Sequence, residues 1–204
     1  MPQVLKDEVQ RRIAEAALRV FARRGFAGAT MAEIGTEAGV STGNLYRYHA
    51  NKESLFRAVV PDAMVAELHR LLRRRLRAVE GVDDVRKLAA DAEFHAVSRL
   101  LMAFSVENRL AMAILLGHAE GTDHAGFAAA LVDELTRSAI AHFRKLRPGL
   151  EVGRVRRAGV TRVYGNLLRA FVAALEEHPD PTEMVQAIRD YERYHLAGLK
   201  ALFE

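Results

Sequence analysis

The chain has 204 residues, a length that allows one large domain or two small ones. Half of the residues are apolar, which is ample for a packed core. The absence of Cys excludes disulfides, thiolate metal sites and a thiol nucleophile. The polar segment Met1–Gln10 does not resemble a signal peptide, and no apolar run reaches the roughly 18 residues of a membrane span, so we expect a cytoplasmic protein with no membrane partner.

The net charge of +4 is concentrated in the N-terminal third. Residues 1–57 carry nine Lys or Arg and six Asp or Glu, and residues 58–80 carry five and three. The remaining residues carry 16 and 17. A phosphate-binding surface has this distribution, and a solvated basic face is the alternative.

Helical periodicity dominates the chain, and no alternating strand pattern is convincing. Ile13, Ala16, Ala17, Val20 and Phe21 recur at three- and four-residue spacing, which predicts a first helix. Gly25 is expected to end it, because glycine tolerates positive φ.

Three short helices are predicted next. Thr30 and Glu33 fit a capping box that opens a helix running to about Ala38. Gly39 is placed for a left-handed turn. Ser41 is the expected N-cap of a helix from Thr42 to about Tyr48, and Asn51 caps a fourth helix that starts at Lys52.

Pro61 interrupts the fourth pattern, so we expect either a kink or a break with a new helix beyond it. Glycine and proline then separate five further predicted helices. Their expected ranges are Asp83–Ala103, Val106–His118, Ala125–Leu146, Val152–Glu177 and Thr182–Leu202. The predicted fold is all-α, with a helix-turn-helix domain over residues 1–52 and a helical bundle over residues 53–204.

The second and third helices have the pattern of a helix-turn-helix. Small residues suit their crossing, and Gly35 and Ala38 are placed there. Met31, Ile34, Val40 and Leu45 are expected to close a small core with the first helix. The other face of the third helix, with small and polar side chains, is then left for the major groove of DNA.

The segment Ile13–Val59 closely resembles the DNA-binding domain of TetR-family regulators. The matching motifs, in order and at family spacing, are AALRVFARRGF, T-x-x-E-I, AGVSTGNLYRY and NKESLF. The resemblance covers about 47 residues. It implies a homodimeric regulator of transcription, repressing by default, that is released from or tuned on a pseudo-palindromic operator by a small-molecule effector.

The resemblance also implies roles for single residues. Thr30, Tyr46 and Lys52 align with positions that contact phosphates, and Ser41 and His49 are added as candidates. Thr42, Asn44 and Arg47 align with positions that face base edges, and Gly43 allows close approach. The alternatives are a solvated Arg47 and a Lys52 that only supports the fourth helix. Gly35 replaces the usual Ala, which is expected to weaken its helix by roughly 1 kcal/mol, and His49 replaces the usual Phe.

The last two predicted helices are the expected dimer interface, because the family usually pairs them with their copies. The candidate interface residues are Val163, Leu167, Phe171, Ala174, Val185, Ile188, Tyr191, His195 and Leu202. The alternative is that these stripes pack only within one subunit.

An effector site is expected between the intermediate helices, where soft or polar side chains interrupt apolar faces. The candidates are Phe94, His95, Arg99, Met102, Phe104, Met112, His118, Phe127 and Tyr164. Plain core packing is the alternative for each.

Two other classes of protein are the rival interpretations: an enzyme and a protein that binds an acidic partner or a membrane surface. An enzyme would need a catalytic or metal motif, and the best fragment is the loop with His118, Glu120, Asp123 and His124. We expect a solvated loop there, with no metal, cofactor or catalysis. The arginine-rich stretch from Arg70 to Arg77 fits an acidic partner or a membrane surface, but a solvated helix face is the favoured interpretation.

Overall fold

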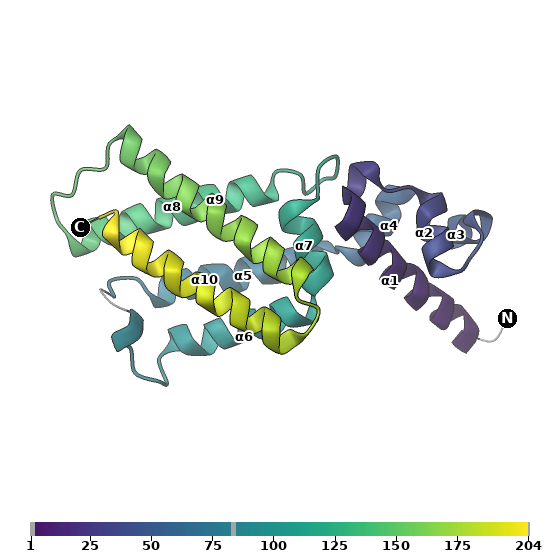
Figure 1. The fold of residues 1–204 in the computed structure, drawn as a ribbon, viewed down its shortest axis with the longest axis horizontal. Helices are drawn as coiled ribbons and strands as arrows, with labels where there is room; N and C mark the ends of the chain where they lie inside the picture. The colour runs from purple at the N-terminus through teal and green to yellow at the C-terminus, as the bar shows by residue number, and fades with distance from the viewer. Residues whose placement is uncertain (1–2, 83–84, 204) are drawn as a thin grey trace. The chain divides into compact units, whose positions relative to one another are not determined.

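The computed structural model describes residues 3–82 and 85–203, and its regular elements there are all helices, as predicted (Figure 1). The first five helices are α1 Gln3–Gly28, α2 Met31–Ala38, α3 Thr42–Tyr48, α4 Lys52–Val59 and α5 Asp62–Ala78. A 3-10 turn, η1, spans Val85–Lys87. The remaining helices are α6 Glu93–Glu107, α7 Arg109–Gly117, α8 Phe127–Leu146, α9 Arg154–Glu177 and α10 Pro181–Ala201.

The chain divides into two compact units. Unit 1 comprises Met1–Val65 with Arg109–Phe127, and unit 2 comprises Ala66–Asn108 with Ala128–Glu204. Helix α5 begins in unit 1 and continues into unit 2. The predicted division into residues 1–52 and 53–204 remains a prediction.

The helix starts in unit 1 are set by side-chain caps at the predicted residues. Thr30 Oγ1 accepts from the Glu33 N–H at 3.1 Å, and Ser41 Oγ accepts from the Asn44 N–H at 3.2 Å. Asn51 forms a full capping box with Ser54. These oxygens satisfy backbone donors that a helix start leaves unpaired.

Glycine sets two turns in unit 1. Gly25 has φ +68° and breaks the helical geometry of α1 where an end was predicted. Gly39, with φ +65° and ψ 35°, closes α2 through a bond from its N–H to Gly35 O. Both conformations are left-handed and disfavour residues with a Cβ.

An aromatic cluster closes the core of unit 1. The rings of Phe21, Phe26 and Phe56 lie 5.2 to 5.8 Å apart between centroids. Ile13 and Leu45 are fully buried beside the other core residues of α1, α2 and α4. The cluster ties α4 to α1, so that the short helices are stabilised by packing.

The structure resolves the alternatives at Pro61 and corrects one predicted helix. Helix α4 ends at Val59 and α5 begins at Asp62, so Pro61 lies in a break and not in a kink. The helix predicted from Asp83 begins only at Glu93, and Asp83 itself lies outside the described residues. Only η1 forms in between, because Val85 and Leu88 are merely half-buried and give a longer helix too little apolar contact.

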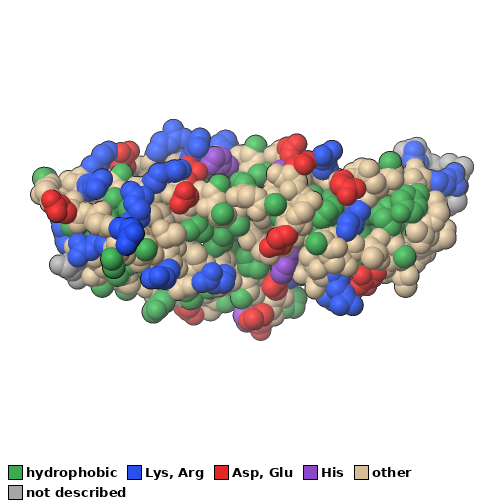
Figure 2. Space-filling model, turned by 90° about the horizontal axis from the view of Figure 1, so that it is seen from above, with side chains coloured by type: hydrophobic (Ala, Val, Ile, Leu, Met, Phe, Trp, Pro, Cys, Tyr) green, Lys and Arg blue, Asp and Glu red, His purple; other side chains and the backbone are tan. Residues whose placement is uncertain are grey.

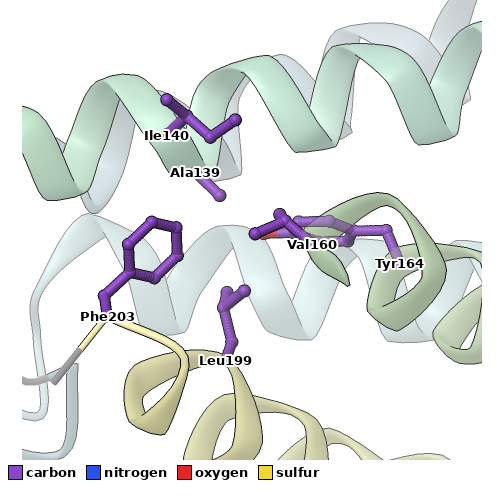
Figure 3. Packing of buried hydrophobic residues seen from close by; sticks show 6 residues of the cluster. All are labelled: Ala139, Ile140, Val160, Tyr164, Leu199 and Phe203. Atoms are coloured by element: carbon purple, nitrogen blue, oxygen red, sulfur yellow. The ribbon is translucent and has the colours of Figure 1, made fainter. Parts of the chain in front are cut away.

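Helices α8, α9 and α10 build the main core of unit 2. Ala139, Ile140, Val160, Leu199 and Phe203 meet there, and Tyr164 completes the cluster (Figure 3). The ring of Phe143 stacks on that of Phe203, with centroids 4.1 Å apart. The C-terminal end of the chain is therefore fixed to α8 by packing.

Within the described residues, no single helix is long and apolar enough to cross a membrane. The bent pair α6 and α7 meets that length and composition only when the two are taken together.

Candidate nucleic-acid interface

Helix α3 is held by one side and presents the other to solvent. Leu45 is fully buried and fixes the helix to the core of unit 1. Gly43 and Arg47 are exposed, and the Tyr46 side chain is 50% exposed although it is aromatic. These three residues lie three and four positions apart and therefore share one outward stripe. Large exposed aromatics of this kind are candidates for contact with a partner.

The remaining α3 candidates flank that stripe. Thr42 and Asn44 are half-buried, on either side of Gly43. Ser41 and Thr30 are exposed, and their hydroxyl oxygens already serve as N-caps. A hydroxyl that accepts from the backbone still has its own proton to donate, so capping does not exclude a phosphate contact.

His49 follows α3 as its C-cap and is half-buried. Burial lowers the pKa of its imidazole below the ordinary value of 6.5. The ring is therefore neutral at pH 7, and it offers a phosphate an N–H donor but no positive charge.

The glycine at position 35 has a structural reason. A Cβ at Gly35 would lie 3.1 Å from Val40 O and 3.6 Å from Thr42 N, so α2 and the turn before α3 approach closely there. That approach supports the prediction of small residues at the crossing. Gly35 avoids this contact, whereas the Ala that the resemblance predicts would need Val40 O to move by a few tenths of an ångström.

Lys52 makes contacts inside unit 1 that the sequence did not predict. Its Nζ donates to Phe26 O at 2.7 Å and to Ala29 O at 2.9 Å, and it lies 4.5 Å from the centroid of the Phe26 ring. The ammonium thus binds carbonyls at the end of α1, where a positive charge is favoured. This arrangement favours the structural role of Lys52 over a phosphate contact.

Most of the arginines of α1 are paired with acids of unit 1. Arg19 Nε lies 2.9 Å from Glu37 Oε1. Arg23 and Arg24 lie 3.4 and 3.3 Å from Glu33 Oε1. Glu33, expected to complete the capping box at Thr30, faces these arginines instead.

Comparison with known proteins identifies unit 1. Residues 13–59 match the model of the bacterial regulatory proteins of the tetR family. This segment, 47 of the 204 residues, is similar to the DNA-binding part of TetR-family regulators. Its helix-turn-helix is α2 and α3, where the resemblance placed it.

Two relatives from Bacillus subtilis (strain 168) share this TetR region. The uncharacterized HTH-type transcriptional regulator YfiR is 38% identical over 66 residues, 32% of each chain. The uncharacterized regulator YerO is 41% identical over 49 residues, 24% of this chain and 17% of YerO. The chain therefore matches only a third or less of the length of these relatives.

Matches to solved structures cover nearly the whole chain, but with low sequence identity and low TM-scores. A TetR-family regulator from Mesorhizobium loti is 21% identical, covers 93% of this chain and 95% of its own, and gives a TM-score of 0.40. MexZ from Pseudomonas aeruginosa is 19% identical, with 94% of both chains covered and a TM-score of 0.39.

The predicted effector residues fall into both units. Met112, His118 and Phe127 belong to unit 1. Met112 is buried in its core, and the His118 backbone carbonyl accepts from the Phe26 N–H at 3.1 Å. The other candidates belong to unit 2, where Arg99 is exposed, His95, Met102 and Phe104 are half-buried, and Phe94 and Tyr164 are buried.

Unit 2 contains a polar cluster around Arg75, although the sequence favours a solvated helix face for Arg70–Arg77. Arg75 Nε donates to Ser98 Oγ at 3.0 Å, Nη2 pairs with Glu192, and the guanidinium lies 4.9 Å from the centroid of Phe94. Arg75 is seven residues after Leu68 and four after Leu71, in the middle of the apolar stripe. The spacing of Arg75 from these leucines is the sequence pattern that could have predicted its inward position.

Two buried residues, Tyr164 and His195, extend this cluster. Their rings lie 4.9 Å apart, and the side chains are 7% and 5% exposed. Burial raises the pKa of Tyr164 to about 12, opposed by the charge of Arg75. Burial, and then the charge of Arg75, lowers the pKa of His195 to about 4. Both side chains are therefore neutral at pH 7.

The predicted dimer residues differ in how much of their surface is exposed to solvent. Ala174, Ile188 and His195 are buried within the single chain. Val163, Leu167 and Leu202 pack against the unit 2 core, and Phe171, Val185 and Tyr191 are half-buried. The large apolar side chains exposed on α9 and α10 are Val155, at 84%, and Tyr194, at 70%. Neither was among the candidates.

Arginines of the stretch Arg70–Arg77 other than Arg75 also form ion pairs. Arg70 pairs with Glu67, and Arg73 and Arg74 pair with Glu134 and Glu93.

In the loop, Arg57 pairs with Asp123, and His124 Nε2 lies 3.3 Å from Asp62 Oδ1. Within the described part of the chain, no three His, Asp or Glu side chains are grouped so that they could hold a metal ion.

Proposed function

We propose that this protein is a sequence-specific regulator of transcription that binds double-stranded DNA through α3. The observation that carries the proposal is the outward stripe of Gly43, Tyr46 and Arg47 on a helix fixed by the buried Leu45. A helix of this kind inserts into the major groove when its inner face is held by the helix before it. The TetR-family match over residues 13–59 supports the same use.

The side chains of α3 suggest how bases are read. Arg47 is exposed and has no partner among the described residues, so its guanidinium group is free to bind O6 and N7 of guanine. Asn44 and Thr42 flank the stripe and fit adenine and thymine edges. Tyr46, Ser41, Thr30 and the neutral His49 would donate hydrogen bonds to phosphates and so fix the register.

The proposal includes a homodimer, because two α3 helices on one duplex read a pseudo-palindromic site. Helices α9 and α10 are the proposed interface. The exposed Val155 and Tyr194 support it, since large apolar side chains at that exposure are favourable to bury. The half-buried Tyr191, whose ring lies 5.5 Å from that of Tyr194, would extend the contact.

The proposed effector site lies in unit 2 around Arg75, Tyr164 and His195. Buried polar side chains within apolar walls are typical of sites that orient a ligand. Arg75 stands on α5, the helix that continues from unit 1. An effector that favours one position of α5 would alter DNA affinity only through its different affinity for the two states. Repression relieved by the effector is the mode that the family resemblance implies.

Selection of bound duplexes from a random library, at about 150 mM salt, tests the proposed function. We expect the wild type to enrich a pseudo-palindrome. Arg47→Ala should lose preference at one symmetric pair of positions, because a bidentate arginine contributes roughly 1–3 kcal/mol of discrimination. A folded protein that enriches no sequence, with or without cell extract as a source of effector, contradicts the proposal.

A further inference from the structure

Few of the positive charges in the N-terminal third are free to bind a partner. Of the nine Lys and Arg up to Arg57, five pair with carboxylates and Lys52 binds backbone carbonyls. Lys6, Arg12 and Arg47 are exposed and make no ion pair or hydrogen bond with a described side chain. Lys6 and Arg12 precede the segment matched by the family model.

The ion pairs between α1 and α2 show where the start of α1 lies. Arg19 pairs with Glu37, near the end of α2, and Arg24 pairs with Glu33, near its beginning. The two helices therefore run in opposite directions. The N-terminal turns of α1 extend beyond the end of α2 at Ala38, on the side where the chain turns into α3 (Figure 1).

Arg12 and Lys6 lie on the sides of α1 that face the rest of unit 1. Arg12 is seven residues before Arg19 and eleven before Arg23, so it continues the stripe that meets α2. Lys6 is seven residues before the fully buried Ile13 and continues the core stripe. Both stand about two turns, or roughly 10 Å, beyond the residues whose stripes they extend.

We propose that Lys6 and Arg12 bind phosphates of the same duplex whose bases α3 reads. Basic side chains are visible at this end of the molecule (Figure 2). Duplex DNA presents one negative charge per roughly 1.7 Å of its axis, so basic side chains beyond the end of α2, on the side of α3, can meet further phosphates. This inference rests on the proposed function and adds the first turns of α1 to the DNA-binding surface.

Arg11 provides a matched control for Arg12. It is the preceding residue, has the same charge, and pairs with Glu8 and Glu15 of its own helix at 2.8 and 2.6 Å. Arg12→Gln and Arg11→Gln remove the same charge from the same helix, and glutamine keeps a similar helix propensity. Circular dichroism would verify that both variants fold.

The test is the salt dependence of binding to a fluorescent duplex of arbitrary sequence and to a selected duplex, from about 50 to 200 mM salt. Each lost phosphate contact reduces the slope of log K against log salt by about 0.9. The wild-type affinity should therefore fall roughly threefold more over this range than that of Arg12→Gln. Lys6→Gln should show the same effect, and the double variant about twice the change in slope.

The inference is overturned if Arg12→Gln and Lys6→Gln keep the wild-type slope, or if Arg11→Gln reduces it equally. The duplex of arbitrary sequence separates this result from the proposed function. A wild type that binds both duplexes equally contradicts sequence-specific regulation, whereas the slopes still report on Lys6 and Arg12. A wild type that binds neither duplex overturns both proposals.

Discussion

Acidification should destabilise this protein through His195. The histidine is buried against Tyr164 and near Arg75, and its pKa is lowered from 6.5 to about 4. Between these values the unfolded chain binds a proton that the folded chain does not bind. Stability therefore falls as the pH falls through this range. For a single site with these two pKa values, the loss from pH 7.5 to pH 5.0 is about 2 kcal/mol.

Urea unfolding of the wild type and of His195→Leu, at both pH values and one protein concentration, measures this effect. The wild type should lose about 2 kcal/mol more than the variant, because leucine does not titrate. The lowered pKa of His49 acts in the same direction but equally in both proteins, so it cancels. His95→Leu, at a half-buried position in the same unit, controls for the replacement of a histidine by leucine. An equal loss in the wild type and His195→Leu would refute a buried neutral His195.

Two further predictions concern unit 1 and the dimer. Lys52→Met should lower the free energy of unfolding by about 2 kcal/mol, since its ammonium makes charged hydrogen bonds to Phe26 O and Ala29 O. It should leave the salt slope of DNA binding unchanged, whereas unchanged stability with a smaller slope would assign Lys52 to a phosphate. Tyr194→Glu should weaken self-association about tenfold or more in sedimentation equilibrium, because it places a charge in the proposed interface. An unchanged dimer would exclude the α10 face.

The helix caps and the glycine turn of unit 1 could be predicted from the sequence. Thr30, Ser41 and Asn51 cap the helices that follow them, and Gly39 has the predicted left-handed turn conformation. These predictions depend on chemistry within three or four residues, which the sequence contains. Short-range rules therefore located the helix-turn-helix.

Contacts between residues that are far apart in the sequence could not be predicted. Lys52 binds carbonyls more than twenty residues earlier, and Arg75 pairs with Glu192 more than one hundred residues later. Periodicity places Arg75 within a leucine stripe, but only the fold shows which acid meets it. Ala174 and His195 are buried by neighbours within the chain, which the stripe alone does not reveal.

The most direct test of sequence-specific DNA binding is one competition titration at about 150 mM salt. The selected duplex is compared with a duplex of the same composition in which the half-sites are scrambled. The account predicts an affinity for the selected duplex at least about a thousandfold higher, which is the usual margin of specific over non-specific binding. Equal affinities for the two duplexes would contradict it.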